Sequence, residues 1–161
     1  MQIEMTIKGL MIDPITNMPI IILRDGDGSR LLPIWVGVFE ANAIALQIEN
    51  VQTPRPMTHD LMKNILCDLN AHVERIVVCG LRENTFYATI DLRTADHELR
   101  IDARPSDAIA LALRANAPIF VEEDVIESAR GVEASKDSMD VARLQKWLEG
   151  LSEEELGKYK M

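Results

Sequence analysis

Three polar segments of the chain could carry chemistry, and each leads into an apolar run that predicts a helix. They are residues 32–40, 54–60 and 101–107. Backbone N–H groups at a helix N-terminus are unpaired, and the helix dipole there favours negative charge. We therefore expect an anion or phosphate site near these helix starts, with Arg55 and Arg104 as its cations.

Acidic side chains and a histidine lie in or beside these segments. Glu40 belongs to a nearly all-apolar helical run, where a carboxylate needs an arginine or a metal ion as its partner. His59 could act as a base held by Asp60, although neighbours in sequence rarely face each other on a helix. Asp102 and Arg104 are two residues apart, so on a strand they would face the same side and could pair.

Each of these side chains also has a purely structural interpretation. Thr58 and Ser106 are residue types preferred at helix N-caps, while Asp60 and Asp107 would complement helix dipoles in first turns. Trp35 lies between two apolar residues and is more typical of a core than of a base-stacking surface. The chain contains neither a phosphate-binding glycine loop nor a His-Glu-x-x-His motif, so these patterns name no reaction.

Hydrophobic patterning predicts the elements that must position these residues. We expect strands at 3–10, 19–23, 30–36, 73–81, 85–92, 98–103 and 118–121. We expect helices at 40–50, 106–116 and 122–130, and one that begins at Thr58. The last has an apolar stripe made of Leu61, Ile65 and Leu69 together with Met62 and Leu66. Helices 40–50 and 106–116 are apolar nearly all round, which predicts burial on two sides.

The chain carries an internal repeat. Ala-Ile-Ala-Leu at 43–46 recurs at 108–111, and segment 5–10 resembles segment 76–81. Each copy has the pattern of a strand, a hairpin and a helix, so 1–50 and 71–116 are predicted to be duplicated units. We expect an α+β domain over 1–130, in which a sheet packs against helices, and a linker and C-terminal helical tail over 131–161.

Composition sets limits on the function. The 161 residues fit one domain with a short appendage, and the net charge of −9 is the opposite of a basic nucleic-acid footprint. No apolar run is long enough to cross a membrane and no secretory signal is present, so we expect a cytoplasmic protein. Cys67 and Cys79 are expected to be reduced and in the core.

Several long motifs resemble the bifunctional nuclease family of bacteria and plants. They include LPIWVGVFEANAIAL at 32–46, PRPMTHDL at 54–61, IDARPSDAIALAL at 101–113 and APIFVEEDV at 117–125. The resemblance covers nearly the whole chain. It implies a compact α+β domain, usually oligomeric, in the bacterial cytoplasm, and cleavage of RNA and DNA.

This resemblance leads to a nuclease hypothesis. Carboxylates for catalysis would come from Glu40, Asp60, Asp102 and Asp107, of which Glu40, Asp102 and Asp107 are candidate ligands for Mg²⁺ or Mn²⁺. His59 would be a general acid or base, and the substrate would be bound by Arg55, Arg104, Thr58 and Ser106.

The acidic charge favours an alternative, which is a non-catalytic binding or regulatory module with an anion-binding polar site. In either case two helices that are apolar all round leave more apolar surface than a small monomer covers. We therefore expect a homo-oligomer, most simply a dimer.

Overall fold

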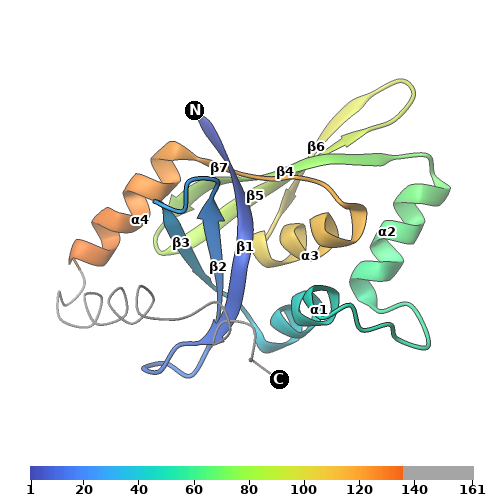
Figure 1. Cartoon of the computed structure of the whole chain (residues 1–161). Helices are drawn as coiled ribbons and strands as arrows, with labels where there is room; N and C mark the ends of the chain where they lie inside the picture. The colour runs from blue at the N-terminus through green and yellow to red at the C-terminus, as the bar shows by residue number, and fades with distance from the viewer. Residues whose placement is uncertain (136–161) are drawn as a thin grey trace.

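Within residues 1–135, a seven-stranded mixed sheet forms the centre of the fold, with four helices around it (Figure 1). The structure is a computed structural model that describes residues 1–135, with side chains to residue 130. The elements are β1 (Gln2–Ile12), β2 (Pro19–Asp25), β3 (Leu31–Trp35), α1 (Val38–Ile48), α2 (Thr58–Asp68), β4 (His72–Arg82), β5 (Thr85–Arg93), β6 (Glu98–Ala103), α3 (Pro105–Ala115), β7 (Ile119–Glu122) and α4 (Glu123–Ser135). The α+β class predicted from the sequence is confirmed.

The strand order is β3-β2-β1-β7-β4-β5-β6, which places β7 between two three-stranded halves. Ile119 of β7 lies opposite Met5 of β1 in an antiparallel pair and opposite Ile76 of β4 in a parallel pair. Each half is an antiparallel meander followed by a helix, α1 in the first half and α3 in the second. This element order agrees with an internal repeat, and the superposition of 1–50 on 71–116 stays a prediction.

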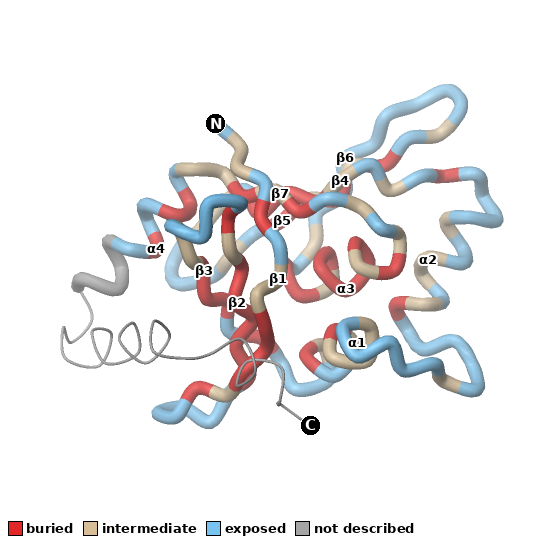
Figure 2. The backbone as a smooth tube through the Cα atoms, in the orientation of Figure 1, coloured by how far each residue is buried: buried red, intermediate tan, exposed pale blue. Residues whose placement is uncertain are grey.

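The two Ala-rich helices differ in burial, although both were expected to be covered on two sides. Eight residues of α3 are buried, among them the whole run from Ala108 to Ala112. In α1 only Ala41 and Ile44 are buried, so the expectation of two-sided burial was wrong for α1. Figure 2 shows the same contrast, because α3 lies inside the molecule while α1 has one face in solvent.

Helix α2 packs on α3 at the edge of the molecule (Figure 1). Met62 and Leu66 pack against the core. The other three side chains of the expected stripe, Leu61, Ile65 and Leu69, are 52%, 49% and 69% exposed. Only part of the stripe therefore packs on the core, and three of its apolar side chains face away from it.

Three smaller observations concern the rest of the chain. Cys67 and Cys79 are both exposed, so the prediction that they belong to the core was wrong. Helix α4 continues to Ser135, past the expected end at Arg130, and the remainder of the expected tail lies outside the described residues. No helix within residues 1–135 has the length and apolar character needed to cross a bilayer.

A candidate active site where three helices begin

The first turns of α1, α2 and α3 meet at one place on the molecule. Their N-cap residues are Gly37, Met57 and Arg104. The third residue of each helix is an acid: Glu40, Asp60 and Asp107. Thr58 and Ser106 are thus the first and second residues of their helices, and the interpretation of these two as N-caps was wrong.

Arg104 lies at the centre of the cluster. Its Nη2 is 3.0 Å from Glu40 Oε1 and 2.8 Å from Asp107 Oδ2, and its Nε donates to the same Asp107 oxygen at 2.8 Å. The hydrogen bond and charge of Asp107, followed by those of Glu40, raise the pKa of Arg104 above its ordinary value. One guanidinium therefore joins the first turns of α1 and α3.

The expected pairing of Arg104 with Asp102 is not formed. Strand β6 ends at Ala103, so Arg104 is already the N-cap of α3 and no longer follows the alternation of the strand. Asp102 stays on β6 opposite Thr89 and is exposed.

Gly37 makes room for the Glu40 carboxylate. A Cβ at Gly37 would clash with Glu40 Oε2, which folds back over the helix start. The Gly37 backbone has φ −70° and ψ 157°, a conformation open to any residue, so a larger residue here would be opposed only by the position of the Glu40 carboxylate. The Glu40 side chain is 18% exposed and is held against Arg104.

His59 contacts Asp107, the carboxylate that also holds Arg104. His59 Nε2 lies 2.9 Å from Asp107 Oδ1, and the imidazole is 9% exposed. Among the described residues, His59 Nδ1 has no hydrogen-bond partner. Asp107 thus fixes an imidazole and a guanidinium together, which is an arrangement suited to proton transfer beside a bound anion.

Asp60, considered from the sequence as a possible partner of His59, contacts Arg114 instead. Asp60 Oδ1 accepts from Arg114 Nε at 2.6 Å, and Asp60 Oδ2 accepts from the Met57 N–H at 2.9 Å. Burial raises the pKa of Asp60, but the hydrogen bonds from Met57 and Arg114 outweigh it and leave the pKa below its ordinary value. Both oxygens of Asp60 are therefore occupied.

Arg114 was missed in the sequence, although it is the one basic residue in the last turn of a nearly all-apolar helix. Its side chain is 4% exposed and also donates to the backbone oxygens of Ala110 and Ala43, at 2.9 and 3.0 Å. A charged residue inside an apolar helix was the available signal, because such a residue is buried only with partners.

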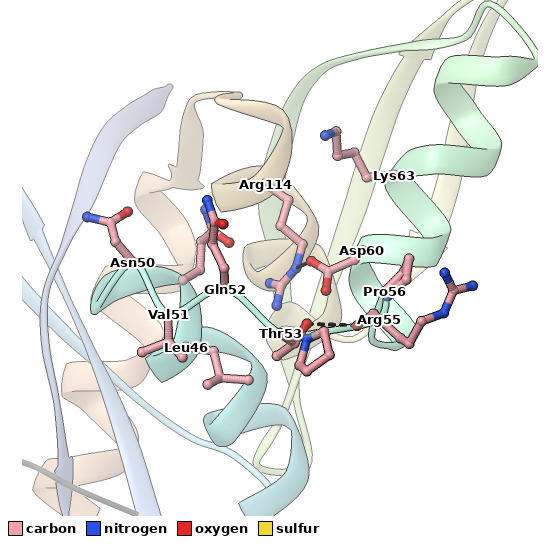
Figure 3. Close-up of a pocket in the computed structure, with 12 residues that line it drawn as sticks. Leu46, Asn50, Val51, Gln52, Thr53, Arg55, Pro56, Asp60, Lys63 and Arg114 are labelled. Carbon is pink, nitrogen blue, oxygen red and sulfur yellow. Dashed lines mark hydrogen bonds and ion pairs between the residues drawn. The ribbon is translucent and has the colours of Figure 1, made fainter.

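Two neighbouring cavities divide the expected site residues. A cavity of about 360 Å³ is lined by ten residues, among them Glu40, Thr58, His59, Arg104 and Asp107. Arg55 lies in a second cavity of about 430 Å³ with Asp60, Lys63 and Arg114. Figure 3 shows Arg114 and Asp60 pointing toward each other, while the Arg55 guanidinium points away from them. Asp102 and the buried Ser106 line neither cavity, so the expectation of a single concavity holds only in part.

Comparison with known proteins identifies the family. A family model for the bifunctional nuclease domain matches residues 21–134. The chain belongs to the bifunctional nuclease domain family. An uncharacterized protein of Mycobacterium tuberculosis is 40% identical over 126 residues, which are 78% of this chain and 75% of that protein.

Plant members of the bifunctional nuclease family are more distant and longer. Bifunctional nuclease 2 of Oryza sativa is 30% identical over 135 residues, which are 80% of this chain and 42% of the rice protein. Bifunctional nuclease 1 of Arabidopsis thaliana is 30% identical over 126 residues, which are 74% of this chain and 39% of the relative. The chain thus spans less than half the length of these plant nucleases.

Of the three residues expected to bind a divalent metal in this bifunctional nuclease domain, Glu40 and Asp107 line one cavity and Asp102 does not. Arg104 lies between Glu40 and Asp107, so a positive charge already occupies the space between these carboxylates. Within the described part of the chain, no three His, Cys, Asp or Glu side chains are placed to hold one metal ion. The side chains present therefore do not fit a resident Mg²⁺ or Mn²⁺ at this cluster.

Proposed function

We propose that this chain hydrolyses phosphodiester bonds in RNA and DNA at the cluster formed by His59, Asp107 and Arg104. Membership of the bifunctional nuclease domain family and the names of the plant relatives support the reaction class. The observation that carries the proposal is the shared carboxylate of Asp107, which contacts His59 at 2.9 Å and Arg104 at 2.8 Å in one cavity.

His59 is the proposed general base. In the tautomer whose Nε2–H donates a hydrogen bond to Asp107, Nδ1 carries a lone pair and has no hydrogen-bond partner among the described residues. An enzyme that cleaves DNA as well as RNA cannot depend on the 2′-hydroxyl as the nucleophile, so water is the attacking group. The water oxygen bonds to phosphorus while His59 takes its proton, and the bond to the leaving oxygen breaks as that oxygen takes a proton from solvent.

Arg104 and Asp107 have supporting roles in this proposal. The Arg104 guanidinium donates to phosphate oxygens and stabilises the charge that develops on them. Asp107 keeps the His59 ring in one tautomer and orientation, as a carboxylate does for a catalytic histidine in other hydrolases. Glu40 holds the Arg104 guanidinium from the side of α1.

Hydrolysis of labelled single-stranded RNA and DNA, with and without EDTA, tests the proposal. We expect His59→Gln to lower the rate by about 10²- to 10⁴-fold, because that is the usual contribution of a positioned acid–base group. His97→Gln is the matched control, since His97 lies in an exposed turn between β5 and β6. Full activity of His59→Gln, or no hydrolysis under any condition, would contradict the proposal.

A non-catalytic oligomeric module with an anion-binding site is the second candidate. The exposed apolar side chains of Leu61 and Ile65 on α2, and of Leu69 at its C-cap, favour it because a second copy would cover them. The net charge of −9 favours it as well. This candidate predicts no hydrolysis, and a mass by light scattering of at least twice the 18.1 kDa of one chain. Oligomerisation and catalysis are compatible, so the hydrolysis assay distinguishes the two candidates.

A further inference from the structure

The aromatic ring of Phe39 is unexplained by the proposed hydrolysis. Phe39 is 87% exposed, although burial of a phenylalanine side chain typically contributes about 1.5–3 kcal/mol to folding. It belongs to the first turn of α1 and lines the same cavity of about 360 Å³ as His59 and Arg104. An apolar ring thus stands in solvent beside the charged cluster.

Asn42 lies on the same face of the helix as Phe39. The two residues are three apart in α1, a spacing that places side chains next to each other, and both line the cavity. Asn42 is exposed, and its amide can donate and accept hydrogen bonds. A flat ring beside an amide provides the two interactions that proteins use to bind an unpaired nucleobase, which are stacking and hydrogen bonds to the base edge.

Trp35, which the sequence suggested for either the core or a base-stacking surface, does not stack a base at this cavity. Its indole N–H donates to Asp13 Oδ2 at 2.8 Å, and the residue is 37% exposed. It does not line the cavity that contains Arg104.

We propose that Phe39 and Asn42 form a nucleobase subsite that binds one unpaired base of a single-stranded nucleic acid. The proposal rests on the proposed function, because Arg104 must hold the adjacent phosphate. A duplex cannot present a base to Phe39, since its bases are stacked and paired. The subsite therefore makes single-stranded RNA and DNA the preferred substrates.

Binding to two oligonucleotides of equal charge tests the subsite. Fluorescence polarisation would compare a labelled single-stranded oligodeoxynucleotide with an abasic strand of the same length. Stacking of a base on an aromatic side chain contributes enough that we expect Phe39→Ala to weaken affinity for the base-bearing strand by about 5- to 100-fold. Affinity for the abasic strand should not change, and Phe39→Tyr should bind like the original protein.

Val38→Ala is the matched control. Val38 precedes Phe39 in the same exposed first turn, is 60% exposed and does not line the cavity. We expect Val38→Ala to leave both affinities unchanged, and Asn42→Ala to reduce the preference for the base-bearing strand. Equal binding of the two strands by the original protein, or equal effects of Phe39→Ala and Val38→Ala, would overturn the subsite.

A second copy of the chain is the competing occupant of the Phe39 ring. If Phe39→Ala converts an oligomer to an 18.1 kDa monomer and leaves base-bearing affinity unchanged, the ring belongs to an interface and the subsite is overturned. The outcome for the hydrolysis proposal is separate. Base-dependent binding without hydrolysis supports the subsite and contradicts the nuclease, whereas hydrolysis with unchanged binding by Phe39→Ala contradicts the subsite alone.

Discussion

Arg114 joins three helices through one buried guanidinium, and its removal should destabilise the fold strongly. Its side chain is 4% exposed and donates to Asp60 on α2, to the Ala43 oxygen on α1 and to the Ala110 oxygen on its own helix. Arg114→Ala would leave the Ala43 oxygen without this donor and the Asp60 carboxylate without its cation.

The expected loss in the free energy of unfolding is about 2–4 kcal/mol. Removal of one partner of a buried ion pair usually costs about 3–5 kcal/mol. The smaller value applies here because Asp60 is 31% exposed and keeps its hydrogen bond from the Met57 N–H. For a domain of this size each kcal/mol lowers Tm by about 2–4 °C, so the melting temperature should fall by roughly 5–15 °C.

Urea and thermal unfolding would measure the effect, with Arg93→Ala as the control. Arg93 also contacts two acids, Glu74 at 2.8 Å and Glu98 at 3.5 Å, but its side chain is 57% exposed. Solvent screening limits such surface pairs, so this variant should lose less than about 1 kcal/mol. Equal losses for Arg93→Ala and Arg114→Ala would refute the argument that burial makes Arg114 important.

A double-mutant cycle with Asp60→Asn would isolate the pair itself. We expect a coupling energy above about 1 kcal/mol. The pKa of Asp60 is below its ordinary value of 3.8, so its contribution is complete at neutral pH and is lost as pH falls through the folded-state pKa. The stability difference between the original protein and Asp60→Asn should therefore shrink below about pH 4. Two results would contradict a structural role for the Asp60–Arg114 pair. One is a stability difference for Asp60→Asn that does not change with pH, and the other is a double variant whose loss equals the sum of the losses of the two single variants.

Two further predictions concern Glu40, which Arg104 contacts, and Asp91, which two arginines of the sheet contact. Gly37→Ala should displace Glu40 from Arg104 and lower the free energy of unfolding by about 1 kcal/mol. In a Glu40→Ala background the same substitution should cause no such loss, and equal losses in both backgrounds would exclude the clash as the cause. Asp91 accepts from Arg75 at 2.8 Å and Arg100 at 3.0 Å, and these hydrogen bonds outweigh burial and hold its pKa below 3.8. Asp91→Asn should thus lower Tm at pH 7 and have a smaller effect as pH falls below about 4; an effect that grows with acidity would contradict this.

Local patterning in the sequence was sufficient to predict most elements. The strand expected at 98–103 is β6 (Glu98–Ala103), and the helix expected at 106–116 is α3 (Pro105–Ala115). The alternation of apolar residues and the turn residues between the apolar runs are local signals, so one sequence is enough to detect them. The start of α1 was less accurate, because Gly37 caps the helix three residues before Glu40.

The partners of the charged residues could not be predicted in the same way. Asp102 and Arg104 have the spacing of a strand pair, but the chain changes from strand to helix between them. The sequence offered only the neighbouring Asp60 as a possible partner of His59, whereas the partner is Asp107 of α3, 48 residues away. These contacts depend on how α1, α2 and α3 are placed relative to one another, and that placement is set by packing on the sheet.

Charge alone gives this site little attraction for nucleic acid. Two carboxylates, Glu40 and Asp107, face the single guanidinium of Arg104, and the chain as a whole carries −9. Long-range electrostatic steering, which brings most nucleic-acid-binding proteins to their targets, is therefore weak here. If the proposed function holds, recognition would come from short-range groups with fixed directions: the guanidinium held by its two acids, the N–H groups of the helix starts, and a ring such as that of Phe39. A site that attracts phosphate weakly would need contacts to the base as well, and the exposed Phe39 ring is placed to provide one.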